Sequence, residues 1–184
     1  MTYLFLANGF EEIEAITCVD ILRRADIQVK TVSLMEEKLV YGAHDIPLEA
    51  DMRFTECDFA SARMAILPGG YEGAMNMIRH PDFRTQLKKM EEGGAYLAAI
   101  CAAPMVLAKA SVIGGRECTI YDGMEKELID AYYVDKDVVV SDRIITGRGP
   151  AAAGAFALTL VAILKGEEKR DQIRKEMLYR DHDL

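Results

Sequence analysis

One cysteine lies where a buried strand runs into a helix with almost no loop between them. Residues 95–100 form a short apolar run, Cys101 follows, and Pro104 suits the first turn of a helix because its missing N–H costs nothing there. Small alanines surround the cysteine and leave room for the tight, strained turn that exposes a nucleophile. The helix N-terminus would then stabilise a thiolate and offer N–H groups to an oxyanion. The alternative is that Cys101 is a small apolar residue that ends a buried strand.

A glycine-rich segment follows another apolar run, at residues 63–67. It reads PGGYEGA over residues 68–74, and Gly69 and Gly70 let the backbone approach a ligand and direct N–H groups at it. The spacing matches neither a Walker phosphate loop nor a dinucleotide-binding loop. Beside a nucleophile, this segment could supply the second half of an oxyanion hole, whereas on its own it is an ordinary turn.

An acidic residue occurs on the apolar face of the first expected helix, residues 11–25. At about 100° per residue, Glu14 falls between Ile21 and Ala25, within the arc that faces the core. A carboxyl group buried there should have a raised pKa, because burial disfavours its charged form. A protonated Glu14 could then donate a hydrogen bond to a thiolate. The competing interpretation is an exposed glutamate in the first turn, where a carboxylate favours the helix N-terminus.

The elements that must position these groups alternate along the chain. Short apolar runs predict strands, and helical periodicity predicts helices between them. The expected strands are residues 3–7, 27–34, 63–67, 95–100, 117–121, 132–134 and 138–145, with weaker alternation at 38–51 that suggests a hairpin or an edge excursion. The expected helices are residues 11–25, 81–92, 102–112, 124–131, 151–165 and 167–180. This alternation predicts an α/β fold, namely a flavodoxin-like, doubly wound, mostly parallel sheet sandwiched between helices, in a single domain over residues 1–184. In such folds a site forms at the carboxyl ends of the strands.

The composition limits the partners and the location of the protein. Its 184 residues carry a net charge of −8, which disfavours binding to the phosphate backbone of a nucleic acid. The N-terminus lacks the basic start of a signal peptide, and the apolar stretch at residues 151–164 is too short to span a bilayer, so no membrane partner is expected. Four scattered cysteines favour reduced thiols and a cytoplasmic location.

The sequence predicts neither a metal site nor a cofactor site. His44, His80 and His182 lack partners at metal-binding spacing and are interpreted as surface residues. Arg148 lies between two glycines just before the helix expected at residues 151–165. It could hold an anion at the site or form a structural salt bridge.

Five short motifs occur in an order that resembles a known family. They are EEIE at residues 11–14, VDILRRA at 19–25, PGGYEGA at 68–74, AICAAP at 99–104 and TGRGP at 146–150. Together they resemble the ThiJ/PfpI superfamily, and within it the DJ-one branch, over essentially the whole chain. The resemblance implies a flavodoxin-like fold, a homodimer, and a reactive Cys101 with Glu14 as its protonated partner. It also implies that Gly70 and Ala102 supply oxyanion-type backbone donors.

Two positions depart from the family pattern. Peptidase members of the superfamily have a histidine directly after the cysteine, where this chain has Ala102, so peptidase activity is not expected. DJ-one members often have a histidine near the cysteine, and the corresponding position here is Tyr121. Without that imidazole, Glu14 is the evident acid or base. Tyr121 and Arg148 are left as candidates for binding the substrate.

The resemblance implies two kinds of function. As an enzyme, the protein would use the Cys101 thiolate to attack a small α-oxoaldehyde such as methylglyoxal, or its adduct on a glycated protein, without glutathione. As a non-enzymatic redox sensor, it would have Cys101 oxidised under stress, and a chaperone role would follow. An accessible thiol of low pKa serves both functions equally.

Overall fold

A mostly parallel sheet forms the centre of the computed structural model, which describes residues 1–180. The strand order is β10-β11-β7-β6-β1-β2-β5, and within these residues every pairing in this sheet is parallel except that of β10 with β11. The strands are β1 (Thr2–Leu6), β2 (Val29–Ser33), β5 (Met52–Arg53), β6 (Met64–Leu67), β7 (Tyr96–Ile100), β10 (Val138–Ser141) and β11 (Ile144–Gly147). The predicted α/β architecture is therefore confirmed.

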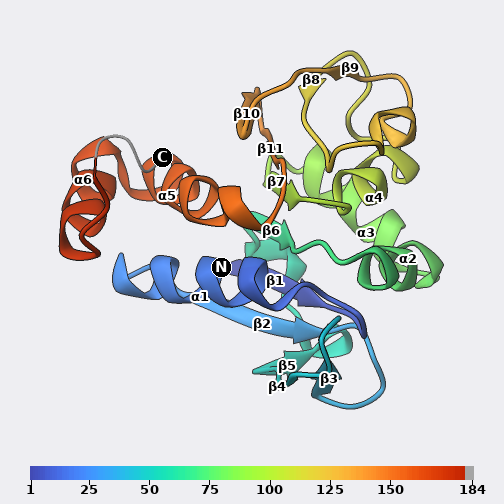
Figure 1. The fold of residues 1–184 in the computed structure, drawn as a ribbon. Coiled ribbons are helices and arrows are strands. Elements are labelled where there is room, and N and C mark those ends of the chain that lie inside the picture. The colour runs from blue at the N-terminus through green and yellow to red at the C-terminus, as the bar shows by residue number, and fades with distance from the viewer. Residues whose placement is uncertain (181–184) are drawn as a thin grey trace.

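Two groups of helices cover the sheet (Figure 1). One group is α1 (Glu12–Arg24), α5 (Ala153–Lys165) and α6 (Glu167–Glu176), and the other is α2 (Tyr71–Arg79), α3 (Phe83–Glu92) and α4 (Pro104–Lys109). The chain moves from β1 to β2 in one direction along the sheet and from β6 to β7 in the other. Because such crossovers are right-handed, the helices that follow β1 and β6 lie on opposite faces. No helix among the described residues combines the length and apolar character needed to cross a bilayer.

The central strands are buried along almost their whole length. All residues of β1 and β6 are buried, as are all residues of β7 except the first. A sheet covered on both faces requires continuous apolar runs, which is why these strands are apparent in the sequence. Two small sheets lie outside it: antiparallel β3 (Leu39–Tyr41) and β4 (Pro47–Glu49), and parallel β8 (Glu117–Cys118) and β9 (Tyr132–Tyr133).

The winding of the sheet reverses between β1 and β6, which lie side by side. In doubly wound sheets such a switch point opens a crevice at the carboxyl ends of the strands. The segments that follow β1 and β6 meet there, because the Glu11 N–H donates to the Gly69 carbonyl oxygen at 2.9 Å. Strand β7 is the next neighbour of β6, so Cys101 also emerges at this edge.

Several elements differ from the sequence prediction. The helix expected at residues 124–131 is only a 3₁₀ turn at Glu125–Glu127. The strand expected at residues 138–145 is an antiparallel hairpin of β10 and β11, with Asp142 at φ +57° in its turn. The segment after Gly70, expected to be a loop, begins helix α2 at Tyr71. The helix expected at residues 102–112 is shorter, because α4 covers Pro104–Lys109.

Helix α2 packs directly on the loop that follows β1. A Cβ atom on Gly73 would lie 2.8 Å from the Gly9 carbonyl oxygen and 2.8 Å from the Phe10 amide nitrogen. Both are backbone atoms, so they cannot move aside unless the loop shifts. Glycine is a poor helix former, yet at this position it allows the two segments to touch.

We expect Gly73→Ala to destabilise the protein by about 1–3 kcal/mol, although alanine is the better helix former. The added methyl group would force α2 away from the loop after β1. Chemical denaturation measures the effect, and Gly114→Ala is the matched control because a Cβ atom there meets nothing within 4 Å. A Gly73→Ala protein as stable as wild type would contradict the close contact.

Candidate active site

Cys101 follows β7 in a left-handed backbone conformation. Its φ is +62°, which costs a residue with a side chain about 1–2 kcal/mol. Two hydrogen bonds hold it there: the Cys101 N–H donates to the Gly147 carbonyl at 2.9 Å, and the Tyr121 N–H donates to the Cys101 carbonyl at 3.0 Å. Only 8% of the residue is exposed. This strand-turn-helix geometry is that of a nucleophile elbow.

The carboxyl group of Glu14 is fully buried beside the cysteine. The Gly69 N–H donates to Glu14 Oε2 at 2.7 Å. A Cβ atom on Gly69 would lie 2.5 Å from Cys101 Cβ and 2.8 Å from Glu14 Oε2, so the three residues are in contact. The other carboxyl oxygen, Oε1, has no hydrogen-bond partner of ordinary geometry among residues 1–180. A buried oxygen without a partner is costly, and most costly when it is charged, which favours the protonated form of Glu14.

Burial raises the pKa of Glu14 to about 7. Hydrogen bonds with Gly69 and Cys101 act in the opposite direction, and the negative charge of Glu11 adds to the rise. The direction agrees with the position of Glu14 on the apolar face of the helix. A substantial fraction of Glu14 is therefore protonated at neutral pH and able to donate a hydrogen bond.

Burial also raises the pKa of the Cys101 thiol to about 12, and the negative charge of an ionised Glu14 adds to the rise. Hydrogen bonds from the N–H groups of Gly70 and Ala102 act in the opposite direction. The net direction is opposite to the lowering expected at a helix N-terminus, because the thiol is buried and α4 begins only at Pro104. When Glu14 is protonated, its charge no longer opposes the thiolate. The favoured ionised state of the pair therefore has one negative charge, on either Glu14 or Cys101, rather than two.

The two glycines after β6 have separate roles. Gly69 and Gly70 were both expected to contribute to oxyanion binding. The Gly69 N–H instead donates to Glu14, so it is not free to bind a substrate oxygen. Gly70 has φ +82°, and a Cβ atom on it would overlap the Gly9 carbonyl oxygen. Only glycine fits there, and its N–H hydrogen-bonds the cysteine together with that of Ala102. Gly70 and Ala102 are therefore the available backbone donors.

Tyr121 and Arg148 line a cavity of about 220 Å³ together with residues 149–152. The Tyr121 side chain is half-exposed, and the Tyr121 N–H donates to the Cys101 carbonyl, so this residue connects the wall of the cavity to the elbow. Arg148 Nε and Nη2 donate to Asp122 at 2.7 and 2.9 Å, and Nη1 lies 2.8 Å from Asp135. The sequence left two roles open for Arg148, binding an anion or forming a structural salt bridge. In the structure Arg148 forms salt bridges with Asp122 and Asp135.

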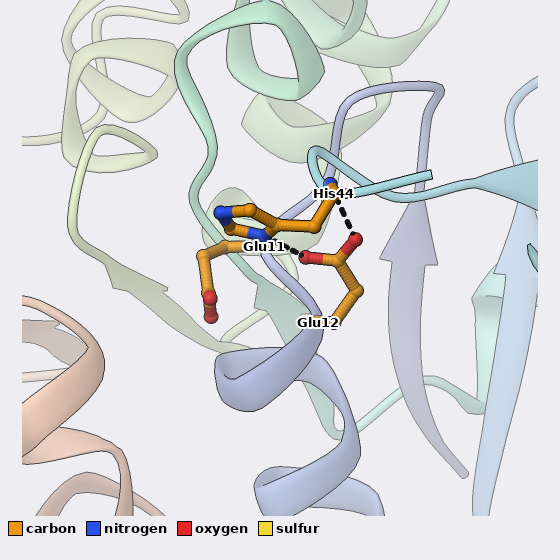
Figure 2. A group of neighbouring side chains, drawn as sticks. All are labelled: Glu11, Glu12 and His44. Atoms are coloured by element: carbon orange, nitrogen blue, oxygen red, sulfur yellow. Dashed lines mark hydrogen bonds and ion pairs between the residues drawn. The ribbon is translucent and has the colours of Figure 1, made fainter. Parts of the chain in front are cut away.

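A second cluster lies at the start of α1 (Figure 2). Glu12 Oε1 accepts the His44 backbone N–H at 2.6 Å, and Glu12 Oε2 lies 2.7 Å from His44 Nδ1. Glu11 Oε2 accepts the Glu14 N–H at 2.7 Å and so caps the helix. His44 is a surface residue, as expected, with 70% of its side chain exposed. Its pairing with Glu12 was not expected, because the two residues are 32 positions apart and no motif joins them.

The chain matches a family of known proteins over most of its length. The sequence profile of the DJ-1/PfpI family covers residues 2–163. The chain belongs to the DJ-1/PfpI family. The resemblance seen in the motifs is therefore confirmed, and a flavodoxin-like fold agrees with it.

Individual members of the DJ-1/PfpI family are similar to the chain from end to end. Protein dj-1beta of Drosophila melanogaster is 38% identical over 177 residues, which are 95% of each chain. Its crystal structure has a TM-score of 0.91 with 96% of each chain covered. The protein named glutathione-independent glyoxalase DJR-1.2 of Caenorhabditis elegans is 34% identical over 91% of this chain and 89% of its own length. The structure of oxidized Toxoplasma gondii DJ-1 has a TM-score of 0.93 at 28% identity, with 97% of each chain covered.

The pKa of Glu14 should make the stability of this DJ-1/PfpI family member depend on pH. The ordinary value is 4.5 and the folded value about 7, so the folded state binds more protons between these two values. The free energy of unfolding should therefore fall as pH rises through this window. Compared with Glu14→Gln, whose amide does not ionise, the free energy of unfolding of the wild type should fall by up to about 3 kcal/mol more as the pH rises through this window.

Urea unfolding at about pH 5 and about pH 8 measures this difference. Glutamine keeps an oxygen that accepts the Gly69 N–H, so the comparison isolates the ionisation. If the stability difference between the two proteins is the same at both pH values, Glu14 does not have the raised pKa.

Proposed function

We propose that the protein is a glutathione-independent glyoxalase that converts small α-oxoaldehydes such as methylglyoxal into hydroxy acids, and that it acts by the same chemistry on their adducts with proteins. The observation that carries the proposal is the buried carboxyl group of Glu14, which lies in contact with Cys101. A nucleophile beside a protonated acid provides the two groups that this reaction needs. The C. elegans relative named as a glutathione-independent glyoxalase supports the same chemistry.

The reaction would begin at the sulfur of Cys101. The thiolate attacks the aldehyde carbon, a C–S bond forms, and the carbonyl electron pair moves to the oxygen, where the N–H groups of Gly70 and Ala102 stabilise the charge. Glu14 gives its proton to that oxygen. The products of this step are a neutral hemithioacetal and an ionised Glu14.

Glu14 would then move a proton between two carbons. Its carboxylate removes the hydrogen on the carbon bound to sulfur as a proton, which gives an enediolate and a protonated Glu14. Glu14 then returns this proton to the neighbouring carbon, the hydroxyl proton moves to the oxygen on that carbon, and a C=O bond forms at the carbon bound to sulfur. The result is a thioester between Cys101 and a hydroxy acid. Water cleaves the C–S bond of the thioester, so the net reaction adds one water molecule to the α-oxoaldehyde.

Glu14 carries these proton transfers because both described histidines have other partners. His44 is bonded to Glu12, and His80 Nδ1 accepts the Phe83 N–H at 3.2 Å. In this proposal one carboxyl group with a pKa near neutrality serves as acid and as base.

Conversion of methylglyoxal to lactate without glutathione tests this proposal. Wild type should form lactate, Cys101→Ser should lose the activity, and Glu14→Gln should be slower by about 100-fold or more because it cannot transfer the proton. Cys57→Ser changes a free thiol outside the site and should keep the wild-type rate. The proposal fails if Cys101→Ser, with the melting temperature of wild type, still turns over at the wild-type rate.

We propose redox sensing as a second function, which the structure of oxidized Toxoplasma gondii DJ-1 favours. The thiolate of Cys101 would attack a peroxide oxygen, an S–O bond would form, and the O–O bond would break to release hydroxide, leaving a sulfenic acid. A second peroxide would give a sulfinate, to which a protonated Glu14 can donate a hydrogen bond. A stress-response or chaperone role would follow. If methylglyoxal is inert while mild peroxide oxidises Cys101 before Cys57, as read by mass spectrometry, this function replaces the enzymatic one.

We also propose that the protein is cytoplasmic, because its four cysteines are free thiols.

We further propose that two copies of the chain associate through α1. Ile13 and Ile16 are 58% and 46% exposed, although another face of α1 is buried against α5. Ile16 also borders a cavity of about 110 Å³ that Val19 and Leu48 help to line. Exposed isoleucines beside an apolar hollow favour contact with another protein surface.

Light scattering should give the mass of a dimer for wild type and of a monomer for Ile16→Asp, because a buried, unpaired carboxylate in the interface is costly. Ile129→Asp is the matched control, since Ile129 is also 46% exposed but lies outside α1. A monomeric wild type, or a dimeric Ile16→Asp, would contradict association through this face.

A further inference from the structure

We propose that Glu11, Glu12 and His44 form a binding site for one divalent transition-metal ion of the zinc type. Each residue offers one ligand atom, and the three atoms lie within 4.8 Å of one another. One imidazole nitrogen and two carboxylate oxygens can bind Zn²⁺ and leave a fourth position for water. The site does not use the Cys101 thiol, so its occupancy can be tested in a protein that lacks this thiol.

The loop that carries His44 is held firmly on the start of α1 (Figure 2). The Ala43 N–H donates to the Phe10 carbonyl at 2.8 Å, and the His44 N–H donates to Glu12 Oε1 at 2.6 Å. Gly42 packs so closely on Glu12 that a Cβ atom there would overlap the carboxyl group. Ligands that are far apart in the sequence are therefore positioned before any ion binds.

The cluster holds more negative charge than the imidazole can balance. Glu11 and Glu12 are 7% and 6% exposed, and His44 supplies at most one positive charge. The positive end of α1 offsets about half a charge more. One oxygen of Glu11 accepts the Glu14 N–H, and the other has no hydrogen bond to any residue in the described part of the chain. A divalent cation would balance both carboxylates and use that free oxygen.

The ligand atoms, which lie within 4.8 Å of one another, would have to adjust their spacing to hold an ion. Bonds of about 2.0–2.2 Å place the ligands of a tetrahedral Zn²⁺ about 3.3 Å apart. The His44 Nδ1 to Glu12 Oε2 distance of 2.7 Å would open slightly, and any proton between these atoms would leave to solvent. The His44 side chain is 70% exposed, so it can rotate, and the ion can enter from solvent on its side.

The ligand set selects the class of ion. Ca²⁺ and Mg²⁺ prefer six or more oxygen ligands, whereas copper(I) prefers sulfur. A single nitrogen with two oxygens suits Zn²⁺ and Co²⁺, and the exposed side of the cluster leaves room for water.

Titration with Co²⁺ tests the site, in a Cys101→Ser background that removes the thiol as a competing ligand. One Co²⁺ per chain should bind and give the weak visible absorption of a nitrogen and oxygen site, without the intense near-ultraviolet band of a cobalt–thiolate bond. Zn²⁺ should displace the Co²⁺, and an excess of Mg²⁺ or Ca²⁺ should not.

His44→Ala should weaken Co²⁺ binding by at least about tenfold, and so should Glu11→Gln, whose amide oxygen can still cap α1. Asp45→Asn, beside the site, and His182→Ala, outside the described residues, should bind like the parent protein. The proposal is overturned if the parent binds no Co²⁺, if a thiolate band accompanies binding, or if His44→Ala binds as tightly as the parent. His44 is mostly exposed, so its substitution should leave the fold intact, as circular dichroism would verify.

Discussion

Glu14 has no exposed surface, and its carboxyl group contacts the Gly69 N–H and the Cys101 side chain. Because ionisation inside the protein is costly, this group keeps its proton to near neutral pH. The position between Glu14 and Cys101 has no space for a side chain, so a glycine must follow β6 there. Helix α1, the loop after β6 and the turn after β7 must therefore converge, and three neighbouring parallel strands bring them together.

The central sheet and the turn at Cys101 were predictable because they depend on local patterns. Buried strands of a covered parallel sheet are continuous apolar runs, and Pro104 marks the helix start after the cysteine. Burial of Glu14 was one of two interpretations that helical periodicity left open, the other being an exposed glutamate in the first turn, and the structure buries it. Its contact with Gly69 could not be predicted, because it joins residues 55 positions apart.

Other features depend on contacts that no local pattern encodes. Helix α2 contains Gly73, which resembles a helix breaker until its packing against Gly9 is known. The pKa of Cys101 moves upward because desolvation outweighs the backbone donors, and burial of a thiol is a property of the folded protein. His44 meets Glu12 only because the loop after β3 folds back onto α1. The histidines have no partners at metal-binding spacing in the sequence, so this cluster could not be predicted from it.

The conformation of Cys101 depends on partners that come much later in the chain. Its N–H is held by Gly147 in β11, and its carbonyl by Tyr121. During synthesis on the ribosome, Cys101 therefore emerges before the segments that hold the elbow, and until then it is a thiol like any other exposed cysteine. Proteolytic removal of the last third of the chain would likewise leave the sulfur present but without its strained setting. The left-handed conformation of Cys101 is thus held only when β11 has joined the sheet.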